Sequence, residues 1–132
     1  GGTVVAVGER ADAGRFSRAD AELNDLATRL GAGLTLADDA ADPDQAVTTR
    51  IDAEPLTAGV ASLGYDWAAT VNVSGAGQSL AETADGTGTL IAAAPVGPGT
   101  FVMTGDSNLV TDDDGGAYAD HDNGRLVHDL CG

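Results

Sequence analysis

Gly105, Asp106 and Ser107 form the stretch of this sequence whose residue types could do chemistry most directly. A serine hydroxyl becomes a nucleophile when a general base accepts its proton, and a carboxylate can orient that base. His121 or His128 could supply the base, although their spacing from Ser107 matches no triad order. The structural alternative, which we favour, is that Gly105 permits a tight strand exit while Asp106 and Ser107 hydrogen-bond the loop backbone.

The densest group of acidic residues lies in the stretch 111–123, TDDDGGAYADHDN. Carboxylate and carbonyl oxygens are the ligands that Ca²⁺ prefers. The full calcium-loop spacing is absent, because no glutamate follows Glu82. A solvated acidic loop is therefore the favoured interpretation, with Ca²⁺ as the alternative and no other cofactor expected. The candidate metal ligands are Asp112, Asp114, Asp120 and Asp122.

A second polar group follows the first predicted strand, Thr3–Val7. In open α/β sheets ligands bind beyond the carboxyl ends of the strands, and Glu9 and Asp106 would share a pocket if their strands are neighbours. The start of a helix at Ser17 could also hold an anion near this group. The predicted ligand-binding residues are Gly8, Glu9, Arg10, Gly105, Asp106, Ser107 and Asn123.

The remaining chemistry-bearing residues favour structural roles. His121 and His128 lack a third zinc ligand at a known spacing. Tyr65 and Trp67 alternate with polar residues, which favours core packing over a sugar-stacking surface. Cys131 is the only cysteine, so an internal disulfide and a cysteine-based metal site are excluded, while pairing with another chain stays open.

Charge is the strongest compositional signal. The 132 residues include 21 Asp and Glu against 6 basic residues, all of them arginine, and the formal net charge is −15. The acidic side chains of such a chain repel one another unless counterions screen them. An acidic, lysine-free composition of this kind is typical of proteins from salt-loving microbes. A GC-rich genome is the alternative, but it would explain the missing lysine and not the acid excess. A nucleic-acid partner is disfavoured, because binding phosphate needs a basic patch.

The sequence contains no apolar run of the roughly 20 residues that a membrane-spanning helix needs. It also opens directly before a predicted strand and stops at a predicted helix end. We therefore expect one domain, residues 1–132, cut from a longer protein that is secreted or lies at the cell surface. Its expected partners are the other domains of that protein, and its oligomeric state stays open.

Local patterns predict the first elements of this domain. Thr3–Val7 is short, apolar and β-branched, which predicts a strand covered on both faces. Ser17 and Asp20 fit a capping box, and Gly31 marks the end of the helix that follows. Residues 34–36 predict a second strand, so this part should be a right-handed parallel β-α-β unit. The apolar face of the helix is predicted to comprise Leu23, Leu26, Ala27 and Leu30.

A hairpin of two buried strands, joined by a Gly-Pro-Gly turn, is predicted for residues 90–104. Residues 65–73 alternate between apolar and polar and predict one half-buried strand. An edge strand is expected at 46–51, one or two helical turns at 55–63, a short strand at 80–83, and a last helix capped by Asp122 or Asn123. Together these elements predict an α/β fold of three layers around a mostly parallel sheet of about five strands.

The order of these elements and three of their motifs resemble a known family. The motifs are the helix LNDLATRLG, the hairpin IAAAPVGPGTFVMTGDSN and the Asp122-Asn123-Gly124 start of the last helix. They look like the class I glutamine-amidotransferase-like domains, a flavodoxin-like family that includes ThuA-like and intraflagellar-transport GIFT-type modules. The resemblance implies a degenerate member, because the family's nucleophilic cysteine has no counterpart before Cys131.

The sequence thus favours a non-catalytic accessory or binding domain of a secreted or surface protein adapted to high salt. The alternative is a hydrolase or metal-dependent enzyme that uses Asp106, Ser107 and the acidic loop at 111–123. An enzyme of that kind must place a base within roughly 3 Å of Ser107, whereas a binding domain need not.

Overall fold

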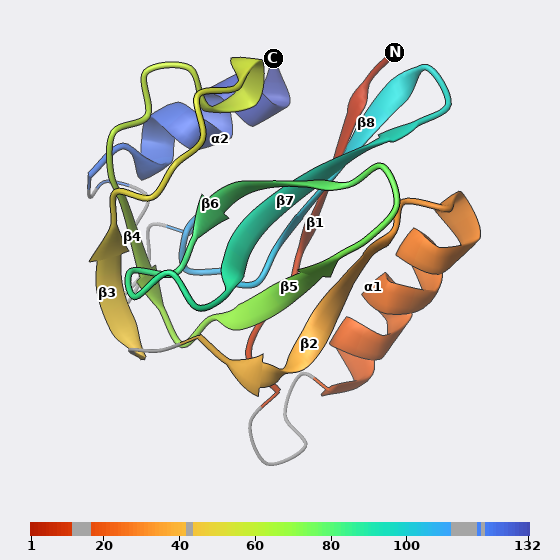
Figure 1. The fold of residues 1–132 in the computed structure, drawn as a ribbon, viewed down its shortest axis with the longest axis horizontal. Coiled ribbons are helices and arrows are strands. Elements are labelled where there is room, and N and C mark those ends of the chain that lie inside the picture. The colour runs from red at the N-terminus through yellow and green to blue at the C-terminus, as the bar shows by residue number, and fades with distance from the viewer. Residues whose placement is uncertain (12–16, 42–43, 112–118, 120) are drawn as a thin grey trace.

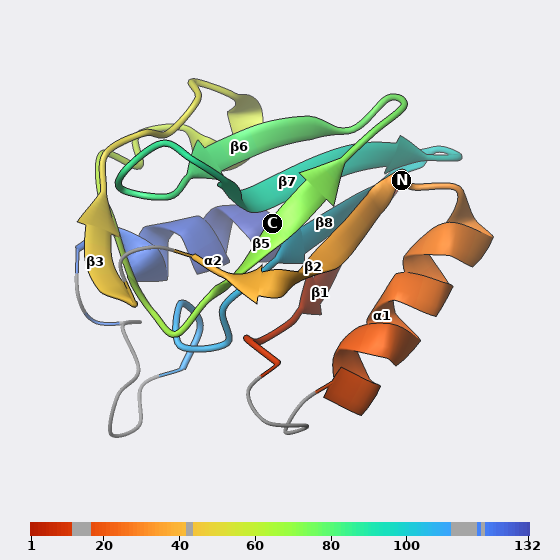
Figure 2. The ribbon, with the colours of Figure 1, turned by 60° about the horizontal axis from the view of Figure 1, so that its bottom comes forward.

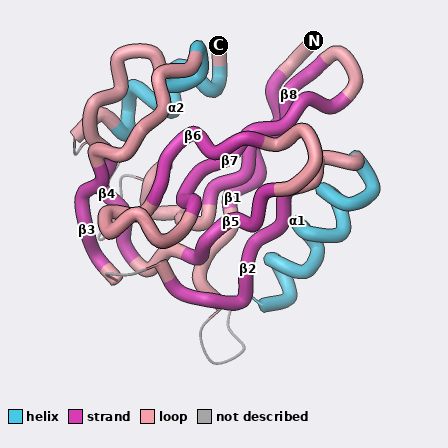
Figure 3. The backbone as a smooth tube through the Cα atoms, in the orientation of Figure 1, coloured by secondary structure: helices cyan, strands magenta, loops and turns pink. Residues whose placement is uncertain are grey.

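A computed structural model describes residues 1–11, 17–41, 44–111, 119 and 121–132. Strands dominate the fold, with one helix near the beginning of the chain and another at its end (Figure 3). The elements are, in chain order, β1 (Thr3–Val7), α1 (Ser17–Leu30), β2 (Leu34–Ala40), β3 (Gln45–Thr48), the short 3-10 helix η1 (Pro55–Thr57), β4 (Leu63–Asp66), β5 (Ala69–Val73), β6 (Gln78–Glu82), β7 (Thr89–Val96), β8 (Gly99–Thr104) and α2 (Asn123–Cys131).

The central sheet has four strands in the order β1-β8-β7-β6 (Figure 1). Within the described residues, β1 and β8 form its parallel pair, and its other two pairs are antiparallel. Two further antiparallel pairs, β2 with β5 and β3 with β4, stand apart from this sheet. The prediction of a three-layer flavodoxin-like fold around a mostly parallel sheet is therefore wrong, and the fold is mostly β with mixed and antiparallel sheets.

The predicted parallel β-α-β unit is also wrong. All three of its elements form, but β2 pairs antiparallel with β5, with Leu34 opposite Val73 and Leu36 opposite Val71. The pairing of β2 depends on a strand much further along the chain, since Leu34 pairs with Val73 and Ala40 with Ala69. Patterns within residues 3–36 could not reveal that choice, because they record only which residues are extended or helical.

Helix α1 ends where the sequence predicts, at Gly31. Gly31 adopts φ of 68°, its N–H bonds to the Thr28 carbonyl at 3.0 Å, and the Ala32 N–H bonds to the Ala27 carbonyl at 3.0 Å. This is the Schellman arrangement, in which a left-handed residue satisfies the last free carbonyls of a helix.

The predicted packing face of α1 is only partly right. Ala27 is fully buried and Leu23 packs against the core, but Leu26 and Leu30 remain about two-fifths exposed. The side of α1 that meets β2 instead carries Asn24, whose side-chain amide bonds to both the N–H and the carbonyl of Leu36, at 2.7 and 3.1 Å. The helix therefore faces β2 with a polar side chain. A prediction based on the spacing of apolar residues cannot identify such a contact.

The predicted hairpin is confirmed as strands β7 and β8, which are the two middle strands of the central sheet. Its strands pair from Ile91 opposite Thr104 to Val96 opposite Gly99, and Gly97 takes φ of 55° in the turn. Their side chains alternate between two cores, so that Val102 lies in one cluster and Phe101 with Met103 in the other. A strand covered on both faces explains the continuous apolar run in its sequence.

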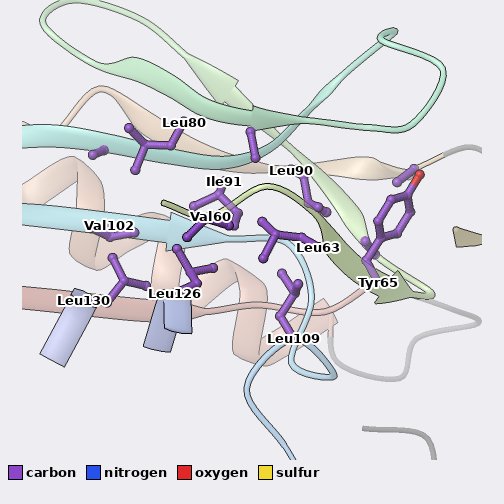
Figure 4. Close-up of a cluster of buried hydrophobic side chains, with 14 residues drawn as sticks. Val60, Leu63, Tyr65, Leu80, Leu90, Ile91, Val102, Leu109, Leu126 and Leu130 are labelled. Carbon is purple, nitrogen blue, oxygen red and sulfur yellow. The ribbon is translucent and has the colours of Figure 1, made fainter. Parts of the chain in front are cut away.

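Each face of the central sheet has its own cover. One face is covered by the pair of β2 and β5 together with α1 (Figure 2). Phe101 and Met103 belong to the core cluster on this face. On the other, Leu126 and Leu130 of α2 pack toward Val102 (Figure 4). The sheet is therefore buried in its middle strands, whereas its edge strand β1 is not: Val4 remains 53% exposed. The prediction that Thr3–Val7 is covered on both faces is right at Val5 and Ala6, which pack against the two cores, and wrong at Thr3 and Val4, which are exposed.

The single strand predicted for residues 65–73 is broken in two. Trp67 adopts φ of 59°, a left-handed conformation that a bulky residue rarely takes. The chain turns there, so β4 pairs with β3 and β5 pairs with β2. Tyr65 is buried as predicted, but Trp67 is 46% exposed.

Candidate functional site

The ends of β1 and β8 lie side by side, because the two strands are parallel neighbours with Val7 opposite Thr104. The Gly8 N–H continues the pairing with a 2.9 Å bond to the Thr104 carbonyl. Just beyond, the Ser107 hydroxyl donates to Oε2 of Glu9 at 2.5 Å. The structure thus brings together two predicted site residues that are 98 positions apart in the chain.

Asp106, the neighbour of Ser107 in the chain, is fully buried. Its Oδ2 accepts the N–H of Asp66 at 2.9 Å and its Oδ1 accepts the N–H of Asn108 at 2.7 Å. Burial raises the pKa of Asp106 to about 7; the two backbone hydrogen bonds oppose the shift, and the nearby Glu9 and Asp66 carboxylates add to it. Asp106 therefore joins the end of β4 to the turn after β8.

Two predicted site glycines are places where chains approach closely. A Cβ on Gly105 would lie 1.9 Å from the carbonyl oxygen of Ala69, whose N–H bonds to the Gly105 carbonyl at 2.8 Å. A Cβ on Gly8 would lie 2.3 Å from a methyl group of Leu36. Both positions lack space for a side chain, which is a packing requirement and does not indicate a ligand.

Arg10 turns away from Glu9 toward β3 and the turn after β4. Its Nη1 lies 2.5 Å from Oδ1 of Asp44, and its guanidinium carbon lies 4.7 Å from the ring centre of Trp67. The Trp67 N–H also bonds to the Asp44 carbonyl at 2.7 Å. Sequence reasoning missed Trp67 at this edge, because alternation placed it in the core and no glycine or asparagine signals its left-handed backbone.

Asn123 belongs to a different part of the molecule. It is fully buried, its Oδ1 accepts the Gly64 N–H at 2.9 Å, and its Nδ2 donates to the carbonyls of Gly64 at 2.8 Å and Leu109 at 3.3 Å. All its hydrogen-bonding groups are used by backbone, so it fastens α2 to β4.

The candidate metal ligands are not brought together in the described part of the chain. Asp112, Asp114 and Asp120 lie outside the described residues. Asp122 precedes α2, and its Oδ2 accepts the N–H groups of Ala61 and Ser62 at 2.8 and 3.1 Å, which lowers its pKa. Within the described ranges, no group of three or more His, Cys, Asp and Glu side chains is arranged to hold a metal.

The edge at Glu9 and Ser107 has limited chemical capability. Both histidines are exposed at or next to α2, and Nδ1 of His128 lies 3.2 Å from Oδ1 of Asp129. Both carboxylate oxygens of Asp106 accept backbone N–H groups. Near the predicted anion position, Oδ1 of Asp20 in the first turn of α1 accepts the Glu9 N–H at 3.3 Å. The carboxylates gathered here disfavour an anionic ligand.

The described surface also carries an apolar groove of about 350 Å³. Leu56 of η1, Leu80 of β6 and Pro95 of β7 contribute to its walls. None of the predicted site residues that the structure describes lines it. None of the helices in the described part of the chain combines the length and apolar character needed to cross a membrane.

Comparison with known proteins identifies the fold. No family model and no curated protein matches the sequence. A solved structure, the mmIFT52 N-terminal domain, superposes with a TM-score of 0.73 at 15% identity, over 97% of this chain and 62% of that chain. The chain thus spans less than two thirds of this neighbour's length, and the similarity shows the fold alone.

These findings correct the family assignment made from the sequence. No family or curated match supports a class I glutamine-amidotransferase-like domain of the ThuA-like or GIFT-type kind. The mixed and antiparallel sheets replace the flavodoxin-like architecture on which that assignment depended. The comparisons give no support for a halophilic source or an extracellular location.

Proposed function

We propose that this chain is a non-catalytic binding domain of a larger protein. The observation that carries the proposal is that the candidate catalytic side chains make hydrogen bonds within the folded chain. Asp106 is fully buried and accepts two backbone N–H groups, and the Ser107 hydroxyl donates to Glu9. A catalytic serine needs a base that can take its proton and return it, and in the described residues no histidine contacts Ser107.

The structural neighbour supports the second half of the proposal. Its name describes an N-terminal domain, which is one part of a longer chain. This chain aligns with it over 97% of its own length, so a similar position as one domain within an assembly is consistent with the fold. A binding domain also needs no cofactor.

The alternative is a hydrolase with Ser107 as nucleophile and Glu9 as base. The 2.5 Å contact between their oxygens is the observation that favours it. Turnover of p-nitrophenyl acetate, p-nitrophenyl phosphate and p-nitrophenyl glycosides by the wild type and by Ser107→Ala would decide between the binding domain and the hydrolase. We expect both proteins to match the buffer rate, and any turnover that Ser107→Ala abolishes while the variant stays folded would overturn the proposal.

A further inference from the structure

The strand edges of this fold differ in whether their backbone N–H and carbonyl groups are hydrogen-bonded. A free strand edge exposes unpaired N–H and carbonyl groups to which another chain can add, so proteins usually block it. Asn24 occupies the backbone groups of Leu36 in β2, and Asn123 occupies those of Gly64 in β4. Two side chains thus close two edges.

Strand β6, at one end of the central sheet, is closed by backbone. The Asp52 N–H bonds to the Leu80 carbonyl and the Glu82 N–H bonds to the Arg50 carbonyl, both at 2.9 Å. Its register with β7 is also shifted twice, and bulges of this kind discourage the addition of a further strand.

Strand β1, at the other end, has no such protection within the described ranges. It pairs with β8 on one side, and no described strand or backbone hydrogen bond meets its other side. Its sequence, TVVAV, contains no charge and no proline, although the chain as a whole carries a net charge of −15. The exposed side chain of Val4 adds an apolar contact beside this edge.

The free backbone groups of β1 can be assigned. The Gly2 carbonyl and the Gly8 N–H both face β8, with bonds to Thr100 N–H and Thr104 carbonyl of 3.0 and 2.9 Å. Backbone groups alternate sides along a strand, so those of Thr3, Val5 and Val7 point away from β8. Thr3 and Val4 are exposed and Ala6 is buried, so the half of the edge around Thr3 to Val5 is the more open.

We propose that this edge binds an extended segment of a partner protein, which adds to the sheet beside β1. The segment carries apolar residues that contact Val4 and basic residues between them. The charge of −15 argues for a basic segment and against a second copy of this chain, because two such copies repel each other. The inference rests on the proposed binding function and names where and by what chemistry the partner is held.

A heptapeptide of alternating Lys and Val, acetylated and amidated, is the probe. It should bind the full 132-residue chain, and amide exchange at Thr3 and Val5 should slow at least tenfold. The same peptide N-methylated at its valines keeps charge and side chains but cannot pair, so it should bind at least tenfold more weakly. Equal binding of both peptides would overturn the inference and leave the non-catalytic proposal to its own turnover test.

Val4→Lys and Val47→Lys form a matched pair of variants. Both valines lie on strands and are about half exposed, at 53% and 45%, and both changes alter the net charge equally. Val4→Lys should weaken peptide binding at least tenfold and Val47→Lys less than twofold. Equal losses would show a general charge effect and overturn the inference. A dimer that forms in molar salt and that Val4→Lys disrupts would assign the edge to a second copy instead.

Discussion

The side chain of Asn123 hydrogen-bonds to both the N–H and the carbonyl of Gly64, at 2.9 and 2.8 Å, across 59 residues of sequence. This places the first residue of α2 against the outer edge of β4. The same amide group also reaches the Leu109 carbonyl. One buried side chain thus connects the last helix, a strand of a small sheet and the turn region after β8.

Removal of this amide should be costly. Asn123→Ala leaves the Gly64 N–H buried without a partner, and we expect a loss of about 2–3 kcal/mol in the free energy of unfolding. Urea denaturation measures it, with His128→Ala as the control, because that side chain is 84% exposed on the same helix. A loss no greater than that of the control would show that water replaces the amide.

The titration of Asp106 should make stability depend on pH. Its folded pKa of about 7 lies above the ordinary value of 3.8, so the folded state holds the proton more tightly than the unfolded state. Its contribution is complete below pH 4 and is lost as pH rises to about 7, by about 4 kcal/mol at most. The difference in unfolding free energy between wild type and Asp106→Asn should therefore shrink from pH 4 to pH 8. A constant difference would contradict this assignment.

The close approach at Gly105 predicts a strong effect of one methyl group. Gly105→Ala would place its Cβ against the Ala69 carbonyl, and backbone has little freedom to move, so we expect a loss of about 3 kcal/mol. Gly2→Ala is the control, because nothing lies within 4 Å of the position that its methyl group would take, and it should change stability by less than about 0.5 kcal/mol. Equal thermal midpoints would exclude the predicted clash.

The net charge predicts that salt stabilises the protein. With 21 acidic and 6 basic residues, repulsion in the folded state falls as the screening length drops to roughly 3 Å at 1 M salt. The thermal midpoint should rise steadily from low to molar KCl. Micromolar Ca²⁺ at constant ionic strength should leave it unchanged, whereas a rise would identify a specific calcium site.

Part of the candidate site can be read from local sequence. The run after β8 marks Asp106 and Ser107, and the run after β1 marks Glu9, because polar residues that follow an apolar strand stand out. That Glu9 meets Ser107 depends on the pairing of β1 with β8, which local patterns leave open. Asn123 is also predicted to belong to this site, but the structure places it between α2 and β4.

The sequence by itself determined the elements whose signals are local: helix α1 with its Gly31 end and the hairpin of β7 and β8. These depend on neighbouring residues through a glycine helix end, turns and β-branched runs. Helix α2 starts beside Asp122 as predicted, but neither Asp122 nor Asn123 caps it, because both side chains bond to backbone of other segments. The tertiary structure alone decided that β2 pairs with β5, that Trp67 breaks a strand, and that Asp106 is buried. Strand pairing and burial depend on contacts between distant segments, and an extended residue has the same local pattern whichever neighbour it joins.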